Sequence, residues 1–552
     1  MYSTEPLPHF VDDYLAYLHE IHPTGATFDG VHFHDDLLED LGRSSIDLQV
    51  RELGGFARRL EGIDPTTLTG DEQLERRMVQ SNIQGRLVEL EEVRAWERNP
   101  QYYADIIAAS LASQAIFSYA PAPERARRIV SKLRQVPRLL ESARLNIKEP
   151  PGIFAKVGIE TLEGVLAFIE RDLPLAFRDV DDLHVLGDLA DTCADASRAV
   201  GEYVTYLRDT VAPKSRGSFR LGRELFERKL ATEDGLAISA DRLLAIAERE
   251  LRAAQEDFRR VAARQNGADS LETWRRLKSE HPALGQLVPA VREQLGELVA
   301  FLERHRIISV PGGEDVIVAP TPQFYRWTFA SLWAPGPFEV RSIPAYYYVT
   351  DADPDWPAER QEEHLRDFNY ATLWSISIHE VFPGHLLYYQ HIRRLPSKLR
   401  KSTMFAPMSF IEGWAHYCEQ MMLDAGFKRG DNAVRLGQLA EALIRLVRTI
   451  VGIRLHTEDL SVEQGVRLFR DEAFLEEGSA RREAERGTFD PGYVLYALGK
   501  LMLLKLRADF EARAPDRFNV REFHDRLLRN GSVPFWMQRQ LFLGAGNTQL
   551  LD

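Results

Sequence analysis

Two histidines and a glutamate lie within seven residues of an otherwise apolar segment. The run is His379-Glu380-Val381-Phe382-Pro383-Gly384-His385. Zinc favours neutral imidazole and carboxylate ligands, and a catalytic zinc site usually combines three protein ligands with a water molecule. A neighbouring glutamate can take a proton from that water as it attacks a carbonyl. The segment therefore indicates metal-dependent hydrolysis, with satisfied core histidines beside a helix break as the alternative.

The spacing of the two histidines requires a break in the helix. In the common HExxH pattern the histidines are four residues apart and share one helix face. Here they are six apart, which on a regular helix leaves them roughly 120° out of alignment. Pro383 cannot belong to an undisturbed helix interior, and Gly384 tolerates unusual dihedral angles. We therefore predict a bulge or kink at these two residues that turns His385 back beside His379.

A second group of polar residues follows His385 by 27 positions. Its surroundings suit a helix, on which Glu412, His416 and Glu419 would lie along one side. Burying such groups without partners is costly, and a metal ion would supply a partner. Glu412 is then the third ligand beside His379 and His385. His416 and Glu419 become candidates for supporting the ligands or contacting substrate, and a structural role stays open for both.

The segments around these motifs are mainly helical. Apolar residues recur at spacings of three and four from Ile129 to Ile147 and from Leu244 to Val261, which is the stripe of an amphipathic helix. Ser239 is a plausible N-cap of the second helix. After residue 305 the pattern changes to β-branched and turn residues. We expect a hairpin from 307–310 and 316–318, and an edge strand at 345–349 because Pro344 precedes it.

These patterns predict a mostly α protein. We expect a large multi-helix fold around a cleft, with a small β-sheet at the rim of that cleft. We expect a helical scaffold lobe over residues 1–305. A catalytic lobe over residues 306–552 would carry the short sheet and the metal-binding helices. One continuous fold is the alternative.

Composition and charge exclude several classes of function. The chain is 44% hydrophobic and 28% charged, as in a globular protein, and its net charge of −14 argues against general nucleic-acid binding. Cys193 and Cys418 are too few for a disulfide framework or a thiolate metal cluster. No stretch approaches the ~18–20 apolar residues that cross a bilayer, and the first residues do not form a signal peptide. We expect a cytoplasmic protein without membrane partners; the oligomeric state stays open, a homodimer included.

The two motifs together resemble a known family. The segment 411–419 is similar to the E-G-aromatic-A-x-Y-x-E helix of glutamate-zincin aminopeptidases (gluzincins), whose first glutamate is the third zinc ligand. With the HExxPGH motif at 379–385, it resembles the bacterial family called domain of unknown function 885, which is grouped with the glutamate-zincin metallopeptidases. The likeness is sharpest from about residue 320 to 545. Leu386 and Leu387 stand where the family often has a second histidine; this departure bears on substrate preference and leaves the metal ligands unaffected.

A third segment, 490–500, resembles the G-Y-x-x-x-Y-x-x-G segment of helical zinc oligopeptidases. In those enzymes a tyrosine hydroxyl faces the oxyanion, because attack on an amide carbonyl builds negative charge that a preorganised donor stabilises. Tyr496 is the first candidate for this role and Tyr493 the second, with His416 as a further donor; core packing is the alternative for the tyrosines. His524, in a closing segment that also matches the family, would line the cleft or have a capping or packing role.

The resemblance implies a glutamate-zincin metallopeptidase with Zn²⁺ held by His379, His385 and Glu412. Glu380 would act as the general base and later pass the proton to the leaving amine. We expect a peptidase that acts on short peptides. The alternatives are a metal-dependent hydrolase of a non-peptide amide or ester, and a metal-free helical binding protein. The presence of Glu380 beside all three ligands argues against the metal-free alternative.

Overall fold

The computed structural model describes residues 5–266, 269–313, 315–322, 325–326, 329–546 and 548–551. Most of the chain is helical and a single three-stranded sheet is described, which confirms the predicted mostly α class. The helices before the sheet are α1 (Leu7–Ile21), α2 (Pro23–Asp29), α3 (Arg43–Glu61), α4 (Gly70–Val88), α5 (Ala95–Arg98), α6 (Pro100–Ile116), α7 (Ala122–Asn146), α8 (Gly152–Ala167), α9 (Leu173–Ala176), α10 (Leu183–Tyr206), α11 (Arg223–Glu233), α12 (Ala240–Asn266), α13 (Ser270–Lys278) and α14 (Leu287–His305).

The second half of the chain contains the sheet and the remaining helices. The strands are β1 (Val316–Pro320), β2 (Ala330–Trp333) and β3 (Ala345–Val349). The helices after them are α15 (Ala358–Asp367), α16 (Tyr370–Glu380), α17 (His385–Ile392), α18 (Lys398–Lys401), α19 (Met408–Asp424), α20 (Asn432–Thr457), α21 (Val462–Ala473), α22 (Glu477–Phe489), α23 (Leu495–Arg513), α24 (Val520–Arg529) and α25 (Phe535–Leu543). Short 3₁₀ and π segments join some of the helices.

Both predicted amphipathic helices are present. The stripe that begins at Ile129 lies on α7, and its apolar residues through Ile147 are buried. The second stripe lies on α12, which begins at Ala240 directly after the expected cap position. Phe258 of α12 is fully buried in a cluster shared with α20, α21 and α22. The helical period of apolar residues therefore identified the buried faces correctly.

The predicted hairpin is wrong. Residues 307–310 form no strand, and β1 pairs in parallel with β3, with Val316 opposite Ala345. Ile307 and Ile308 are instead buried in the main core, and the backbone N–H of Ser309 donates to the carboxylate of Asp525. The β-branched side chains at these positions thus serve core packing without a strand partner.

The predicted edge position of residues 345–349 is also wrong. The strand order is β1-β3-β2, so β3 lies in the centre, with β2 antiparallel on its other side. Pro344 stands just before the first residue of the strand, where its missing N–H removes no bond from the ladder. The edge strand β2 was not predicted.

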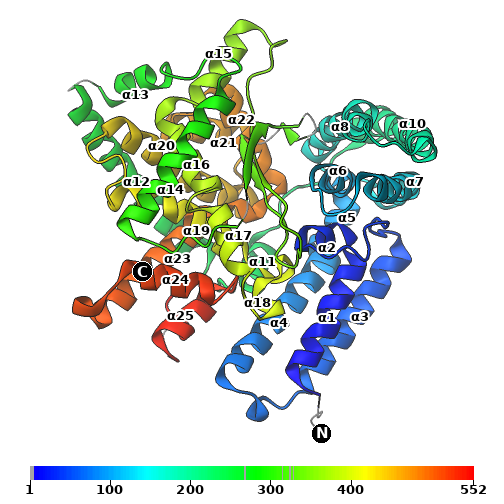
Figure 1. The fold of residues 1–552 in the computed structure, drawn as a ribbon, viewed down its shortest axis with the longest axis horizontal. Coiled ribbons are helices and arrows are strands. Elements are labelled where there is room, and N and C mark those ends of the chain that lie inside the picture. Colours follow the sequence, from blue (N-terminus) through cyan, green and yellow to red (C-terminus); the bar gives the residue numbers. More distant parts are fainter. Residues whose placement is uncertain are drawn as a thin grey trace.

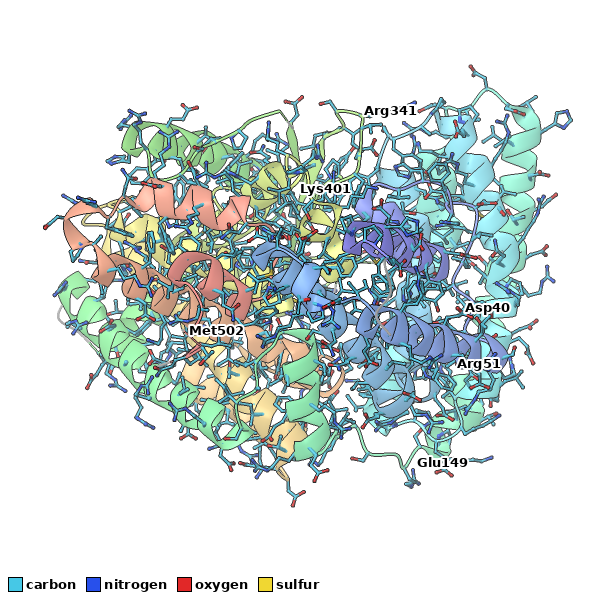
Figure 2. All side chains as sticks on the ribbon, turned by 90° about the horizontal axis from the view of Figure 1, so that it is seen from below. Asp40, Arg51, Glu149, Arg341, Lys401 and Met502 are labelled. Atoms are coloured by element: carbon cyan, nitrogen blue, oxygen red, sulfur yellow. The ribbon has the colours of Figure 1, made fainter. Side chains whose placement is uncertain are left out.

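The arrangement in space places the sheet between two groups of helices (Figure 1). Helices α6, α7, α8 and α10 form a group on one side, and α12, α14, α16 and α20 to α22 lie on the other. The largest cluster of buried hydrophobic residues takes members from both halves of the chain, from Leu7 to Leu551. Figure 2 shows Arg51 of α3 and Met502 of α23 toward opposite ends of the molecule. The division at residue 305 stays a prediction. Among the described residues, no helix is long and apolar enough to span a membrane.

Two helices that carry predicted site residues cross at very short range. A Cβ atom built on Gly413 of α19 would lie 2.6 Å from Cα of Gly499 on α23. A Cβ on Gly499 would in turn lie 2.0 Å from the carbonyl oxygen of Ser409. Only glycine allows this contact between backbones. The crossing brings α19 and α23 together beside α16, which also packs on α19.

Candidate metal centre

A break in the helix brings the two histidines together at the position predicted. Helix α16 ends at Glu380 and α17 begins at His385. The N–H of Gly384 donates to the carbonyl of Ile378 at 3.0 Å. A Cβ on Gly384 would lie 1.8 Å from the carbonyl oxygen of His379, so glycine is required for this close approach. As a result the rings of His379 and His385 lie 4.8 Å apart, perpendicular to each other.

Glu412 completes a group of three from three different helices. Its Oε2 lies 3.3 Å from Nε2 of His379 and 3.6 Å from Nε2 of His385. One ligand atom from each of the three side chains lies within 4.8 Å of the others. All three side chains are largely shielded from solvent, with exposed fractions of 6%, 11% and 14% for His379, His385 and Glu412.

The residues of this group fit a metal ion. Oε2 of Glu412 and Nδ1 of His385 are buried without a hydrogen-bond partner in the part of the chain described. A cation between the imidazoles and the carboxylate would offset the cost of burying the unpaired carboxylate oxygen. Burial alone would lower the pKa of His379, but Glu412 and Glu419 raise it to about 9, so the centre attracts positive charge. Two imidazoles and one carboxylate are a donor set that suits Zn²⁺.

Glu419 fixes His379 from the opposite side. The Nδ1–H of His379 donates to Oε1 of Glu419 at 2.8 Å, and the hydroxyl of Ser375 donates to Oε2 at 2.9 Å. Burial would raise the pKa of Glu419, but the guanidinium of Arg445 holds it well below its usual range. The ionised carboxylate therefore holds the ring of His379 with its Nε2 directed toward Glu412.

His416 does not reach the cavity of the metal ligands. Its Nδ1 lies 3.3 Å from Oε1 of Glu419, and its side chain lines a separate cavity together with Lys500. Burial lowers the pKa of His416 to about 3, with Lys500 as a further cause. The structure therefore places His416 behind Glu419, as a neighbour of the supporting carboxylate.

The three candidate metal ligands line a cavity of about 550 Å³. Glu380 lines the same cavity as His379, His385 and Glu412. The edge strand β2 contributes Ala330, Ser331 and Leu332 to another part of the wall, and α8 and α22 contribute further residues. Glu380 thus lies where a substrate that reaches the three ligands would also meet its carboxylate.

Tyr496 lines this cavity and Tyr493 does not. The ring of Tyr496 stacks on that of His379, with 6.4 Å between centroids and an interplanar angle of 9°. Arg486 donates to its hydroxyl at 3.2 Å. Burial, aided by the charge of Glu412, raises the pKa of Tyr496 to about 12, so its hydroxyl keeps its proton at neutral pH. This hydroxyl can donate to a negatively charged oxygen beside the ligands.

Tyr493 and His524 occupy interior positions. Tyr493 is fully buried, and its hydroxyl has no hydrogen-bond partner among the described residues. The His524 Nδ1–H donates to the carbonyl of Ile307 at 3.0 Å, and its Nε2 accepts from the hydroxyl of Tyr417 at 2.8 Å. Neither side chain lines the cavity of the metal ligands. These contacts give His524 a packing role in the core, one of the roles that the sequence left open.

Arg486 and Tyr325 line the cavity with the predicted site residues and were missed from sequence. Arg486 of α22 contacts Tyr496, yet it lies in a run of charged residues where no spacing distinguishes it. Tyr325 also lines the cavity, and burial together with the charge of Glu380 raises its pKa to about 12. Tyr325 precedes β2, and no periodic pattern of apolar residues around it in the sequence could have identified its direction.

Comparison with known proteins supports the fold. The family described as "Bacterial protein of unknown function (DUF885)" matches residues 23–541. A solved structure described as "a putative lipoprotein of unknown function from Shewanella oneidensis" is 24% identical, with a TM-score of 0.79 over 98% of this chain and 100% of that chain. Another, "the putative lipoprotein from Colwellia psychrerythraea", is 18% identical, with a TM-score of 0.78 over 97% of each chain. At these identities the likeness shows the fold alone. No curated protein matches the sequence.

Proposed function

The chain belongs to the family of bacterial proteins of unknown function DUF885, and we propose that it is a zinc-dependent hydrolase of the glutamate-zincin type that acts on short peptides. One observation carries the proposal: the donor atoms of His379, His385 and Glu412 converge within 4.8 Å beside Glu380, although the two histidines belong to different helices. A cation held between the three side chains would explain why a carboxylate oxygen is buried between two imidazoles with no hydrogen bond from the described residues.

The roles of the side chains follow from their positions around the cavity. Zn²⁺ held by the three ligands would polarise a substrate carbonyl and make a water molecule a better nucleophile. Glu380 would accept the proton of the attacking water at its carboxylate and deliver it to the leaving nitrogen. The hydroxyl of Tyr496 would donate to the carbonyl oxygen as negative charge builds on it, while Arg486 orients that hydroxyl.

The wall of the cavity supports a peptide substrate. Strand β2 is an edge strand whose residues Ala330 to Leu332 line the cavity. An edge strand can offer backbone donors and acceptors to an extended peptide, which suits amide substrates of any sequence. The cavity of about 550 Å³ has room for a short peptide and would exclude a folded protein.

Metal content and a single substitution test the proposal. Elemental analysis of the purified protein should give about one zinc per chain, and Glu412→Ala should abolish it. Glu380→Gln should keep the metal and lower kcat on peptides by about 10²–10⁴-fold. Glu511→Gln, at an exposed position of α23, is the matched control and should keep full turnover. Normal turnover by Glu380→Gln would refute the mechanism.

The same measurements separate the rival functions. Digestion of a peptide library, compared with small amides and esters, distinguishes a peptidase from a hydrolase of non-peptide amides or esters. If the purified protein neither contains metal nor takes it up, the metal-free binding protein is the correct alternative. Cytoplasmic location and the lack of nucleic-acid and membrane partners stay proposals for this chain, although the two similar structures carry descriptions as lipoproteins. Cell fractionation would test the location.

A further inference from the structure

One positively charged side chain in the cavity wall differs from the others. Five cations line the cavity, and Lys278, Arg445, Arg448 and Arg486 each form an ion pair with a glutamate or an aspartate. Arg482 does not. In the described ranges, no carboxylate oxygen lies within the 4.0 Å ion-pair distance of its guanidinium nitrogens. The cavity therefore holds one charge that the protein does not neutralise in direct contact.

The guanidinium of Arg482 is held in place and remains accessible. It lies over the ring of Phe329, 5.4 Å from the centroid, and donates to the hydroxyl of Ser479 at 3.2 Å. The residue is nonetheless exposed, so solute in the cavity can reach it. A guanidinium has five N–H donors in a planar fork that matches a carboxylate. The single donated bond in the structure leaves donors free for such a partner.

The position of Arg482 on α22 sets its distance from the reacting centre. Arg486, four residues later, contacts the hydroxyl of Tyr496. Four residues of helix correspond to about 6 Å along the axis. An extended peptide covers roughly 3.3–3.6 Å per residue. A group bound at Arg482 would therefore belong to a residue about two positions from the carbonyl beside Tyr496.

We propose that Arg482 binds a carboxylate of the substrate, about two residues from the bond that is cleaved. This inference rests on the proposed function, because it takes the carbonyl beside Tyr496 as the reacting group. Either the free C-terminus of a peptide or the side chain of an aspartate or a glutamate can supply the carboxylate. If the C-terminus supplies it, the protein removes a short C-terminal fragment from its substrate.

Binding to a variant that does not turn over substrate tests this assignment. Metal-loaded Glu380→Gln would be titrated by calorimetry with tetra-alanine, with tetra-alanine amide, and with the amide whose last residue is glutamate. The free acid should bind at least about tenfold more tightly than the amide, since a charge-assisted bond is lost. Tight binding of the glutamate-containing amide would assign the site to any nearby carboxylate, and weak binding would assign it to the C-terminus.

Substitution of Arg482 itself completes the test. In the Glu380→Gln background, Arg482→Met should weaken binding of the free acid by about tenfold and abolish the preference for the free acid over the amide. Arg482→Lys in the same background should restore part of this preference. Arg481→Met is the matched control, because Arg481 pairs with Glu463 and Glu477, away from the cavity lining. The Arg481→Met variant should keep the same preference for the free acid over the amide.

The outcomes of these titrations distinguish this inference from the proposed function. Equal binding of acid and amide, a preference that survives Arg482→Met, or no peptide binding at all would overturn the inference. A protein that binds the acid through Arg482 but never hydrolyses it would refute the hydrolase proposal alone. A protein that cleaves acid and amide equally well would refute only the role of Arg482.

Discussion

His379 and Glu419 are joined by a hydrogen bond of 2.8 Å that crosses from α16 to α19. Because Glu412 of the same α19 helix lies 3.3 Å from the other ring nitrogen, one helix contacts both nitrogens of the imidazole. The ring therefore has one orientation and one tautomer available to it. The affinity for metal should depend on Glu419 even though its carboxylate faces away from the ligands.

We predict that Glu419→Gln lowers the affinity for zinc by about 10–100-fold, because the amide no longer fixes and polarises His379 as a carboxylate does. Competition with a fluorescent zinc chelator measures the change. Glu441→Gln is the control, since Glu441 pairs with Arg445, as Glu419 does, but does not contact His379. If both variants lose the same affinity, the loss reflects Arg445 and the role of Glu419 is structural.

Tyr496→Phe should lower kcat on peptides by about 10²–10³-fold, because the donor to the carbonyl oxygen is removed. Metal content should be unchanged, since Tyr496 is not a ligand. Tyr493→Phe tests the tyrosine that the sequence ranked second for this role. Its hydroxyl is buried without a partner, so its removal should leave kcat intact and the thermal midpoint equal or higher. The reverse ranking of the two variants in kcat would contradict the oxyanion role of Tyr496.

Gly384→Ala should disrupt the candidate metal centre. The added methyl group would lie 1.8 Å from the carbonyl oxygen of His379, so the break between α16 and α17 must open and His385 must move. We expect loss of bound metal and a free energy of unfolding lowered by more than about 2 kcal/mol.

Gly187→Ala is the matched control for that change. A Cβ at Gly187 meets no atom within 4 Å, and the residue lies inside α10. Alanine there should stabilise the protein by about 0.5–1 kcal/mol through its higher helix propensity. Thermal unfolding and metal content measure both variants. A Gly384→Ala protein that keeps its zinc would show that the break tolerates a side chain.

His32 makes the stability of the protein depend on pH. Its ring nitrogens contact Asp35 and Glu339, each at 2.9 Å, and thus connect the residues after α2 to the loop before β3. Burial would lower the pKa of His32, but the two carboxylates outweigh it and raise the pKa. The charged ring is therefore stabilising below the unfolded pKa near 6.5, and this contribution is lost as pH rises through the higher folded pKa.

We therefore expect His32→Gln to lower stability by about 2 kcal/mol at pH 6 and by less at pH 9. Thermal unfolding at the two pH values measures the difference. His184→Gln, at an exposed position of α10, should have no effect at either pH. An equal loss at both pH values for His32→Gln would show that packing, and not the charge of the ring, is responsible.

The cluster of His379, His385 and Glu412 could be predicted because the motifs that supply it are local in sequence. Pro383 and Gly384 made a regular helix impossible, and the structure has the break at that place. The pairing of β3 could not be predicted, because strand partners are chosen by contacts between distant segments. The directions of the Tyr493 and Tyr496 side chains could not be predicted, because the backbone changes from 3₁₀ to α geometry between Val494 and Leu495. The sequence offers no basis for separating the roles of Arg482 and Arg486, because the two residues differ only in the side chains that the fold places next to them.

The close crossing of α19 and α23 limits how amino-acid substitutions can alter the cavity. Gly413 and Gly499 touch through main-chain atoms, and Glu412 and Tyr496 stand within three residues of that contact. The spacing between the carboxylate and the hydroxyl is therefore insensitive to substitutions in the surrounding core. In the proposed enzyme, a change of substrate preference would then be expected from substitutions on the facing walls of the cavity, α8 and β2, with Glu412 and Tyr496 keeping their spacing.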